Sequence, residues 1–134
     1  MNKINELIIS LMKIQNFAKD IHYNCKGDAF YSKHLLCDRI AENLYDYVDS
    51  IKETIILARM ERPLPSSSYL EAASNLPALG EDDKENFTKL RNLIVGALTV
   101  IENIDNQSVG EANLLGNIAE NLQNSLGLLN RQVI

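Results

Sequence analysis

Apolar side chains recur at intervals of three and four residues through four long stretches of the chain. This spacing places them on one side of an α-helix, so each stretch predicts an amphipathic helix that buries one face. The predicted helices run from about Lys3 to Cys25, from about Ala29 to Ala58, from Glu81–Asp83 to about Ile101, and from Ser108 to about Leu129. The positions expected to face the core are Ile4, Leu7, Ile8, Leu11, Met12, Ala18 and Ile21; Leu35, Leu36, Ile40, Leu44, Val48, Ile51 and Ile55; Phe87, Leu90, Ile94, Leu98 and Ile101; and Leu114, Leu115, Ile118, Leu122, Leu126 and Leu129.

Residues with capping chemistry stand at several of the expected helix ends. Gly27 can end the first helix in a left-handed conformation, and Asp28 can cap the second by accepting hydrogen bonds from its first amides. The acids at 81–83 favour the start of the third helix, since negative charge stabilises a helix N-terminus. Ser108 and Glu111 form a capping box before the fourth.

Prolines interrupt the helical pattern between the second and third helices. Pro63 and Pro65 lack an amide proton and clash with the preceding turn, so the segment up to the third helix is predicted to be a connection. Within it Ser68 and Glu71 form a second capping-box pattern, which predicts one short helix over about Tyr69–Ser74.

Four long helices and almost no alternating strand pattern predict an all-α four-helix bundle. A connection of about two dozen residues is longer than neighbouring antiparallel helices need. It predicts a crossover along the length of the bundle, carrying the short extra helix, as ferritin-like folds have.

The composition sets limits on the class of protein. The chain has 134 residues, 46% of them hydrophobic, which suits one domain with an ordinary core. A net charge of -5 argues against nucleic acid as a partner. We expect a cytoplasmic protein, because no apolar run approaches the roughly 20 residues of a membrane helix and no signal peptide is apparent. Cys25 and Cys37 are expected to be half-buried free thiols.

Residues with metal-ligand chemistry gather at the end of the first expected helix and along the second. His22 and His34 are the only histidines of the chain, and the second helix adds Asp38, Asp49 and Glu53. At about 100° per residue, the last four of these residues fall within an arc of roughly 100°. However, a rise of about 1.5 Å per residue separates His34 from Asp49 by roughly 22 Å, so one chain cannot bring them to one metal.

Two copies of the second helix, packed antiparallel about a two-fold axis, would bring the two halves of this set together. His34 and Asp38 of one chain would approach Asp49 and Glu53 of the other, and the symmetry would generate the site twice. Imidazole and carboxylate ligands together suit Fe(II), Mn(II) or Zn(II), and a small number of ligands leaves room for an oxidant.

The segment from His22 through Gly27 and Phe30 to His34, followed by Asp38 and Asp49-Ser50-Ile51-Lys52-Glu53, resembles the metal-site segment of the Dps-type miniferritins. That family has a His-Trp pair, a Gly, a Phe, a second His twelve residues after the first, an Asp four later, and then Asp-x-x-x-Glu. The similarity extends more loosely over nearly the whole chain, so residues 1–134 are expected to form a single ferritin-like domain.

The resemblance implies a dodecameric hollow shell with ferroxidase sites between subunits. Fe(II) would be oxidised there, preferentially by hydrogen peroxide, and stored as a ferric mineral. His22 and His34 of one subunit and Asp49 and Glu53 of its partner would bind a di-iron pair, with Asp38 assisting. Acids near the start of the fourth helix would admit iron; the candidates are Glu102, Asp105 and Glu111.

Two features depart from the family pattern. Tyr23 stands where the family has Trp, although a tyrosine can also donate an electron. Lys3 and Lys13 are the only basic residues among the first fifteen, whereas DNA binding in the family relies largely on lysine-rich tails. We therefore expect no direct DNA binding.

Other interpretations of the same residues stay open. His22, Cys25, His34 and Cys37 are a set that tetrahedral Zn(II) would accept. The larger ferritins carry Glu-x-x-His pairs within one chain, but Lys19 and Tyr31 occupy the positions three before the histidines here. A ferritin-like structural or assembly subunit, or an interaction module without oxidation activity, is the alternative function. Acids such as Glu42 and Asp46 are either solvated or line a cage.

Overall fold

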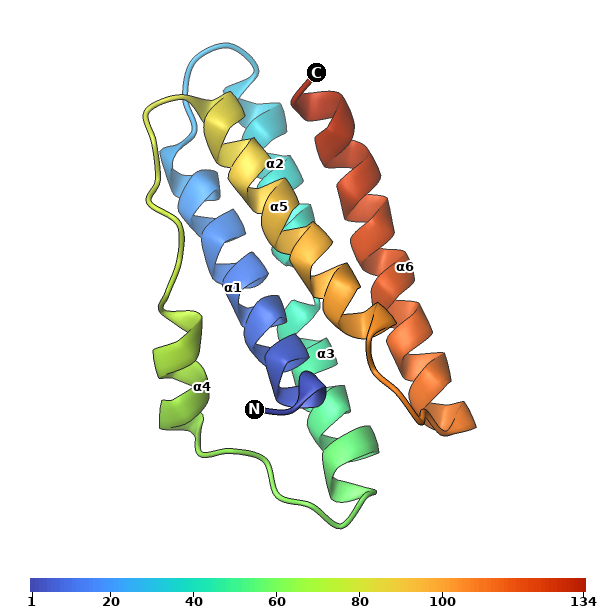
Figure 1. Ribbon diagram of the computed structural model, residues 1–134. Coiled ribbons are helices and arrows are strands. Elements are labelled where there is room, and N and C mark those ends of the chain that lie inside the picture. Colours follow the sequence, from blue (N-terminus) through green and yellow to red (C-terminus); the bar gives the residue numbers. More distant parts are fainter.

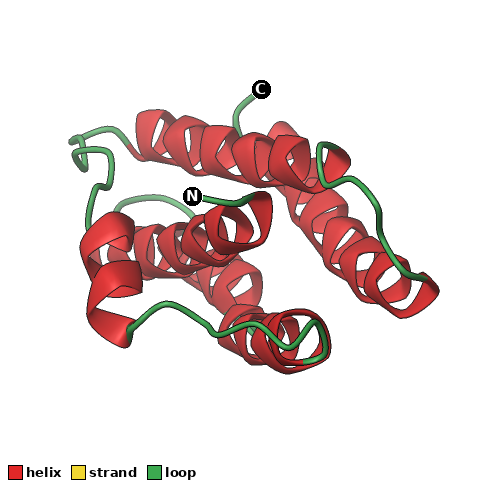
Figure 2. Cartoon of the chain, turned by 60° about the horizontal axis from the view of Figure 1, so that its bottom comes forward, coloured by secondary structure: helices red, strands yellow, loops and turns green.

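The computed structural model describes residues 1–134 and contains helices but no strand (Figures 1 and 2). The long helices lie side by side, and a short helix lies on the outside of this bundle within a long connection (Figure 1). The helices are α1 (Lys3–Asn24), α2 (Phe30–Ala41), α3 (Leu44–Ile51), the π-helix η1 (Lys52–Leu57), α4 (Ser66–Ala73), α5 (Asp83–Glu102) and α6 (Val109–Gln132). The predicted all-α bundle is confirmed.

Helix α1 lies at the centre of the packing. It contacts α2, α3, α4 and α5, while α6 packs against α5. All seven of the α1 positions predicted to face the core are buried, and Ile9, Ile14 and Phe17 join them because neighbours surround this helix on several sides. Burying this much apolar surface is the main source of stability.

The connection between η1 and α5 carries α4 along the outside of α1 (Figure 1). This is the crossover with a short helix that the sequence predicts. Tyr69 anchors it: its buried hydroxyl donates to Asn5 Oδ1 at 2.6 Å and accepts from the Leu64 N–H at 3.1 Å. The predicted capping box at Ser68 was wrong. Helix α4 begins three residues before Tyr69, directly after Pro65, so Ser68 lies inside the helix.

The single helix predicted over Ala29 to Ala58 was also wrong. It is interrupted after Ala41, where Asn43 takes a left-handed conformation with φ 68°, and it resumes as α3 and then widens into η1. Asparagine tolerates this conformation better than most residues. The apolar spacing gave no sign of the break because both halves face one core. In contrast, Leu35, predicted to face that core, is 45% exposed.

The helix ends confirm the capping predictions for the third and fourth predicted helices: Asp82 caps α5 by accepting from the Lys84 N–H at 3.1 Å, and Ser108 and Glu111 form both bonds of their box. Gly27 is left-handed at φ 80°, as predicted, but it does not end α1, because the helix stops at Asn24 and its C-cap residue, Cys25, is already extended. Asp28 does not cap α2. The residue at that position is Ala29, also left-handed, and no side chain bonds to the first amides of the helix.

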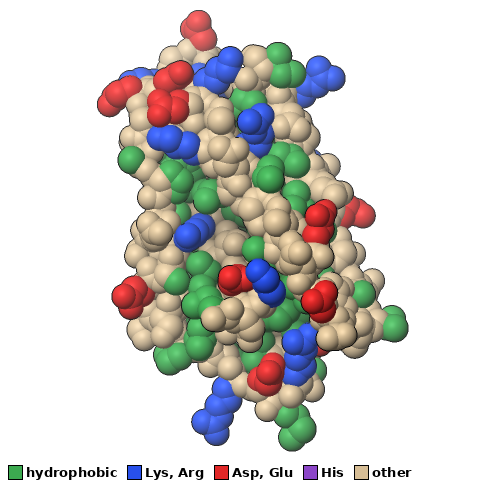
Figure 3. Space-filling view, viewed as in Figure 1, with side chains coloured by type: hydrophobic (Ala, Val, Ile, Leu, Met, Phe, Trp, Pro, Cys, Tyr) green, Lys and Arg blue, Asp and Glu red, His purple; other side chains and the backbone are tan.

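Two further features concern the surface. Acidic and basic side chains are interspersed over the face seen in Figure 3. A membrane span would require a longer or more apolar helix than any of those found here.

Candidate metal centre

The turn between α1 and α2 brings the two histidines of the chain into contact. His22 lies in the last turn of α1 and His34 in the second turn of α2. Their rings stack with centroids 3.5 Å apart and planes 16° from parallel. Residues twelve apart in the sequence therefore become nearest neighbours, because α2 returns along α1.

Each histidine is held by the backbone of the other. Nδ1 of His22 lies 2.7 Å from the His34 carbonyl oxygen, and Nδ1 of His34 lies 2.7 Å from the His22 carbonyl oxygen. A carbonyl only accepts, so both Nδ1 atoms must carry the proton. In the neutral rings this leaves a lone pair on each Nε2. Protein histidines that ligate metals are commonly oriented in this way.

Aromatic side chains border the histidine pair. Phe30 stacks on His34 with ring centroids 5.2 Å apart, and Tyr23 meets the edge of His22 at 4.9 Å. The Tyr23 ring is 73% exposed, so it lies beside the pair and remains open to solvent.

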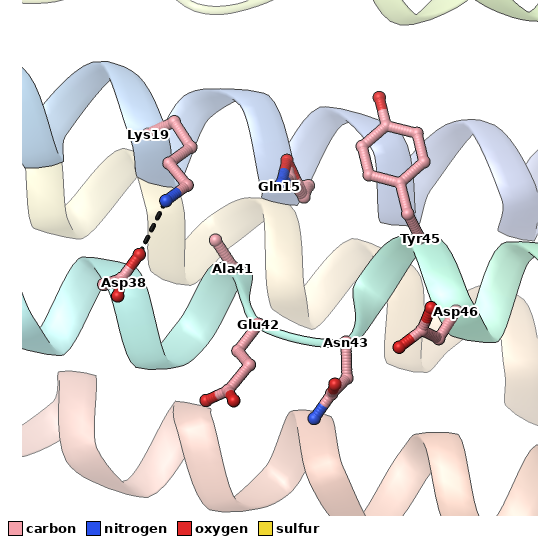
Figure 4. A pocket seen from close by; sticks show the side chains of 8 residues that line it. All are labelled: Gln15, Lys19, Asp38, Ala41, Glu42, Asn43, Tyr45 and Asp46. Atoms are coloured by element: carbon pink, nitrogen blue, oxygen red, sulfur yellow. Dashed lines mark hydrogen bonds and ion pairs between the residues drawn. The ribbon is translucent and has the colours of Figure 1, made fainter.

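Asp38 lies one turn beyond His34 and is paired with a residue that the sequence analysis did not assign to the site. The Lys19 ammonium contacts Asp38 Oδ1 at 2.6 Å (Figure 4). This hydrogen bond and charge lower the pKa of Asp38 and raise the pKa of Lys19. A signal was present: Lys19 precedes His22 by one turn and Asp38 follows His34 by one turn, so antiparallel helices set the two side by side.

The break after Ala41 opens a cavity of about 320 Å³ next to this ion pair (Figure 4). Lys19 reaches down into it from α1, and the ribbon between Glu42 and Asn43 has lost its helical form. The lining residues are Gln15, Lys19, Asp38, Ala41, Glu42, Asn43, Tyr45 and Asp46.

Asp49 and Glu53 lie beyond the break, on α3 and η1. Both are exposed, and neither side chain has a hydrogen bond or ion pair within the chain. The fold thus brings His22 and His34 together and leaves Asp49 and Glu53 apart from them. Nowhere in the chain do three or more His, Cys, Asp or Glu residues come close enough to hold one metal ion.

The two cysteines are free, as predicted, but more deeply buried than predicted. Burial raises the pKa of the Cys25 thiol, and it raises that of Cys37 to about 12. A metal-binding thiolate needs the opposite shift. The zinc set of His22, Cys25, His34 and Cys37 is not assembled in this fold.

The three acids considered for iron entry differ in their surroundings. Glu102 and Asp105 are exposed. Glu111 is 6% exposed and accepts from Arg59 at 2.7 and 2.8 Å and from the Ser108 N–H at 3.1 Å. The Arg59 hydrogen bonds lower the pKa of Glu111. This carboxylate therefore joins the end of η1 to the start of α6.

The comparison with solved structures gives a match, whereas the comparisons with family models and with curated proteins give none. No family model matches the sequence, and no curated protein matches it. Among solved structures, the chain is similar to a mutant of Dps1 from Mycobacterium smegmatis, with a TM-score of 0.75 and 15% sequence identity. The match covers 98% of this chain and 93% of the other. The chain therefore has the ferritin-like helical-bundle fold of the Dps-type miniferritins.

Proposed function

We propose that the chain is a miniferritin subunit that binds Fe(II) as its substrate, oxidises it with hydrogen peroxide, and stores the ferric product inside a hollow oligomeric shell. The observation that carries the proposal is the histidine pair. Both Nδ1 protons are used by backbone carbonyls at 2.7 Å, so both neutral rings offer Nε2 to a metal.

The remaining ligands come from a second copy of the chain. His22 and His34 of one subunit would bind iron together with Asp49 and Glu53 of its partner, and Asp38 would assist after exchanging Lys19 for the incoming cation. The exposed and unpaired state of Asp49 and Glu53 supports this assignment, because a free carboxylate reaches a metal without breaking an existing bond. Imidazole and carboxylate donors suit Fe(II).

The protein's own groups have separate tasks in the reaction. The histidines and carboxylates position the Fe(II) substrate and balance its charge, and the carbonyl bonds hold the imidazoles in orientation. Reduction of one hydrogen peroxide to two waters takes two electrons and two protons, and each Fe(II) supplies one electron. Tyr23, at the edge of His22, is placed to donate an electron if a radical forms.

The fold also supports the wider proposal. Dimers built around these sites would assemble further into a dodecamer, the shell that the resemblance implies. The net charge of -5 supports iron handling without direct DNA binding. We place the protein in the cytoplasm, since its free cysteines suit a reducing compartment.

The test adds Fe(II) anaerobically to the purified protein, then hydrogen peroxide, and follows ferric absorbance together with the native mass. We expect oxidation faster than in protein-free buffer and a mass that is a multiple of two subunits. A stable shell that oxidises Fe(II) no faster than buffer would identify a structural or assembly subunit instead. A persistent monomer would overturn the shared site.

A further inference from the structure

The turn between α1 and α2 has little capping chemistry of its own. Gly27 and Ala29 both have positive φ, 80° and 60°, and no side chain bonds to the first amides of α2. Alanine tolerates this left-handed conformation poorly. Within the turn, the Phe30 N–H donates to the Gly27 carbonyl oxygen at 3.1 Å. Contacts with another part of the chain must therefore help to fix the turn.

Asp83, the first residue of α5, reaches both ends of this turn. Its Oδ2 accepts from the Lys26 N–H at 3.1 Å and from the Lys33 ammonium at 3.0 Å. The same ammonium donates to the Lys26 carbonyl oxygen at 3.3 Å. Figure 1 shows the start of α5 beside the turn. The Lys33 and Asp83 side chains are only 18% and 12% exposed, so water competes little for this ion pair.

The histidine pair depends on the register that the turn sets. Lys26 lies just beyond His22 at the end of α1, and Lys33 directly precedes His34. Each Nδ1 bonds the carbonyl oxygen of the other histidine at 2.7 Å, which requires α1 and α2 to keep one register. A slip of α2 by a single residue would move His34 by about 1.5 Å along the axis and turn it by about 100°. Such a slip would break both bonds.

The other ion pair between these helices is less suited to hold the register. Lys19 and Asp38 are 33% and 53% exposed, and exposed ion pairs contribute little to stability. Asp38 must also release Lys19 when it assists a metal. Asp83 is not a proposed ligand, so it keeps both of its partners whether or not a metal is bound.

We infer that Asp83 is a positioning residue for the histidine pair: through Lys26 and Lys33 it holds α2 in register with α1 and so keeps both imidazoles in the Nδ1–H form. The consequence for metal binding rests on the proposed function, but the arrangement of the rings does not. A third helix, α5, thereby supports a site whose proposed ligands all lie on other helices.

The tautomers of the two histidines test the inference without metal. The chain has no other histidine, so isotope labelling of histidine alone gives the signals of His22 and His34. Solid-state NMR of the metal-free protein at alkaline pH shows which nitrogen of each ring carries the proton. We expect Nδ1–H alone in wild type. Asp83→Ala should add a measurable Nε2–H population to both rings, because a ring freed from its carbonyl can carry the proton on either nitrogen.

The matched control is Glu81→Ala. Glu81 also pairs with Lys26, but through the ammonium at 3.2 Å, and its side chain is 98% exposed. Its removal should leave both tautomers as in wild type. Co(II), added alone as a probe, measures the consequence for binding by its visible absorption. Asp83→Ala should weaken Co(II) binding by about 10-fold, the lower end of the loss caused by removing an outer partner of a metal ligand. Glu81→Ala should bind Co(II) as wild type does.

A second variant covers the case in which Asp83→Ala does not fold, as judged by circular dichroism. Lys33→Met removes the same ion pair from the side of α2 and should give the same mixture of tautomers. A folded variant whose rings stay entirely in the Nδ1–H form would overturn the inference, even if wild-type protein oxidises Fe(II). A mixture of tautomers, together with wild-type protein that binds no Co(II), would support the positioning role while the proposed function fails.

Discussion

The two halves of the interrupted second helix carry equal numbers of candidate ligands but hold them differently. In α2, His34 is bonded to the His22 carbonyl and Asp38 to Lys19, so α1 fixes both side chains. In α3 and η1, Asp49 and Glu53 have no partner in the chain. The contrast teaches that one half of the candidate site is preorganised by its own chain, while the carboxylates of the other half are exposed to solvent and held by nothing in the chain.

The largest expected effect is on Fe(II) oxidation, and it should be the same in both halves. His34→Ala and Glu53→Ala should each reduce the peroxide-driven rate by more than about 100-fold, because removing even an outer partner of a metal ligand costs about 10- to 100-fold. The matched control is Glu120→Ala, which removes an exposed acid from α6. Stopped-flow ferric absorbance measures the rates. Full activity in the Glu53 variant would show that α3 and η1 contribute no ligand.

Substitutions that disturb the preorganised half should change the free energy of unfolding more than substitutions in the other half. Asp83, at the start of α5, accepts from the Lys26 N–H at 3.1 Å and from the Lys33 ammonium at 3.0 Å, and so ties down the turn between α1 and α2. Asp83→Asn should lower the free energy of unfolding by about 1–3 kcal/mol, as for a hydrogen bond to a largely buried charge. Glu53→Gln should change it by less than about 0.5 kcal/mol. Urea unfolding compares them, and equal effects would remove the contrast.

The ion pair between Asp83 and Lys33 should also make the free energy of unfolding depend on pH in the acid range. Burial raises the pKa of Asp83, but the Lys26 N–H and Lys33 outweigh it and lower the pKa below the ordinary value. The contribution is therefore complete above about pH 3.9, the pKa expected in the unfolded chain, and is lost as the pH falls through the lower folded pKa. The stability difference between wild type and Asp83→Asn should disappear below that window. A constant difference down to pH 2 would contradict this origin.

A smaller effect is expected at the boundary between the halves. Asn43→Ala should lower the free energy of unfolding by about 1 kcal/mol, since alanine tolerates the left-handed conformation poorly. Asn43→Gly should be nearly neutral, because glycine adopts positive φ freely. Thermal unfolding of both variants measures this. An Asn43→Ala protein more stable than wild type would indicate that the break heals into a continuous helix.

Apolar spacing was enough to predict the bundle, but not the interruption that separates the two halves. Ile40, Leu44 and Val48 keep the helical interval across Asn43 because α2 and α3 bury the same side, so the pattern continues where the backbone does not. Capping was predicted at Ser108, where the geometry is local. It was wrong at Ser68, where Pro65 allows the helix to begin earlier.

The candidate site was also predictable only in part, because some of its contacts depend on how the helices pack. His22 and His34 were predicted to lie on the first and second helices, and the resemblance assigned both to one subunit's share of the site; the stacked rings show that the two side chains do lie together. The reciprocal carbonyl bonds and the Lys19 pairing depend on how α1 and α2 pack, which spacing along one helix does not describe. The assignment of Asp49 and Glu53 to a site shared with a second chain stays a prediction.

The most direct measurement of the shared site is complementation between inactive chains. His34→Ala and Glu53→Ala proteins, each inactive alone, are unfolded together, refolded, and shown by native mass to form mixed assemblies. A mixed pair has one intact site and one that lacks both ligands, so the account predicts partial recovery of Fe(II) oxidation with peroxide. Mixed assemblies that remain as inactive as their parents would contradict a site built from two chains.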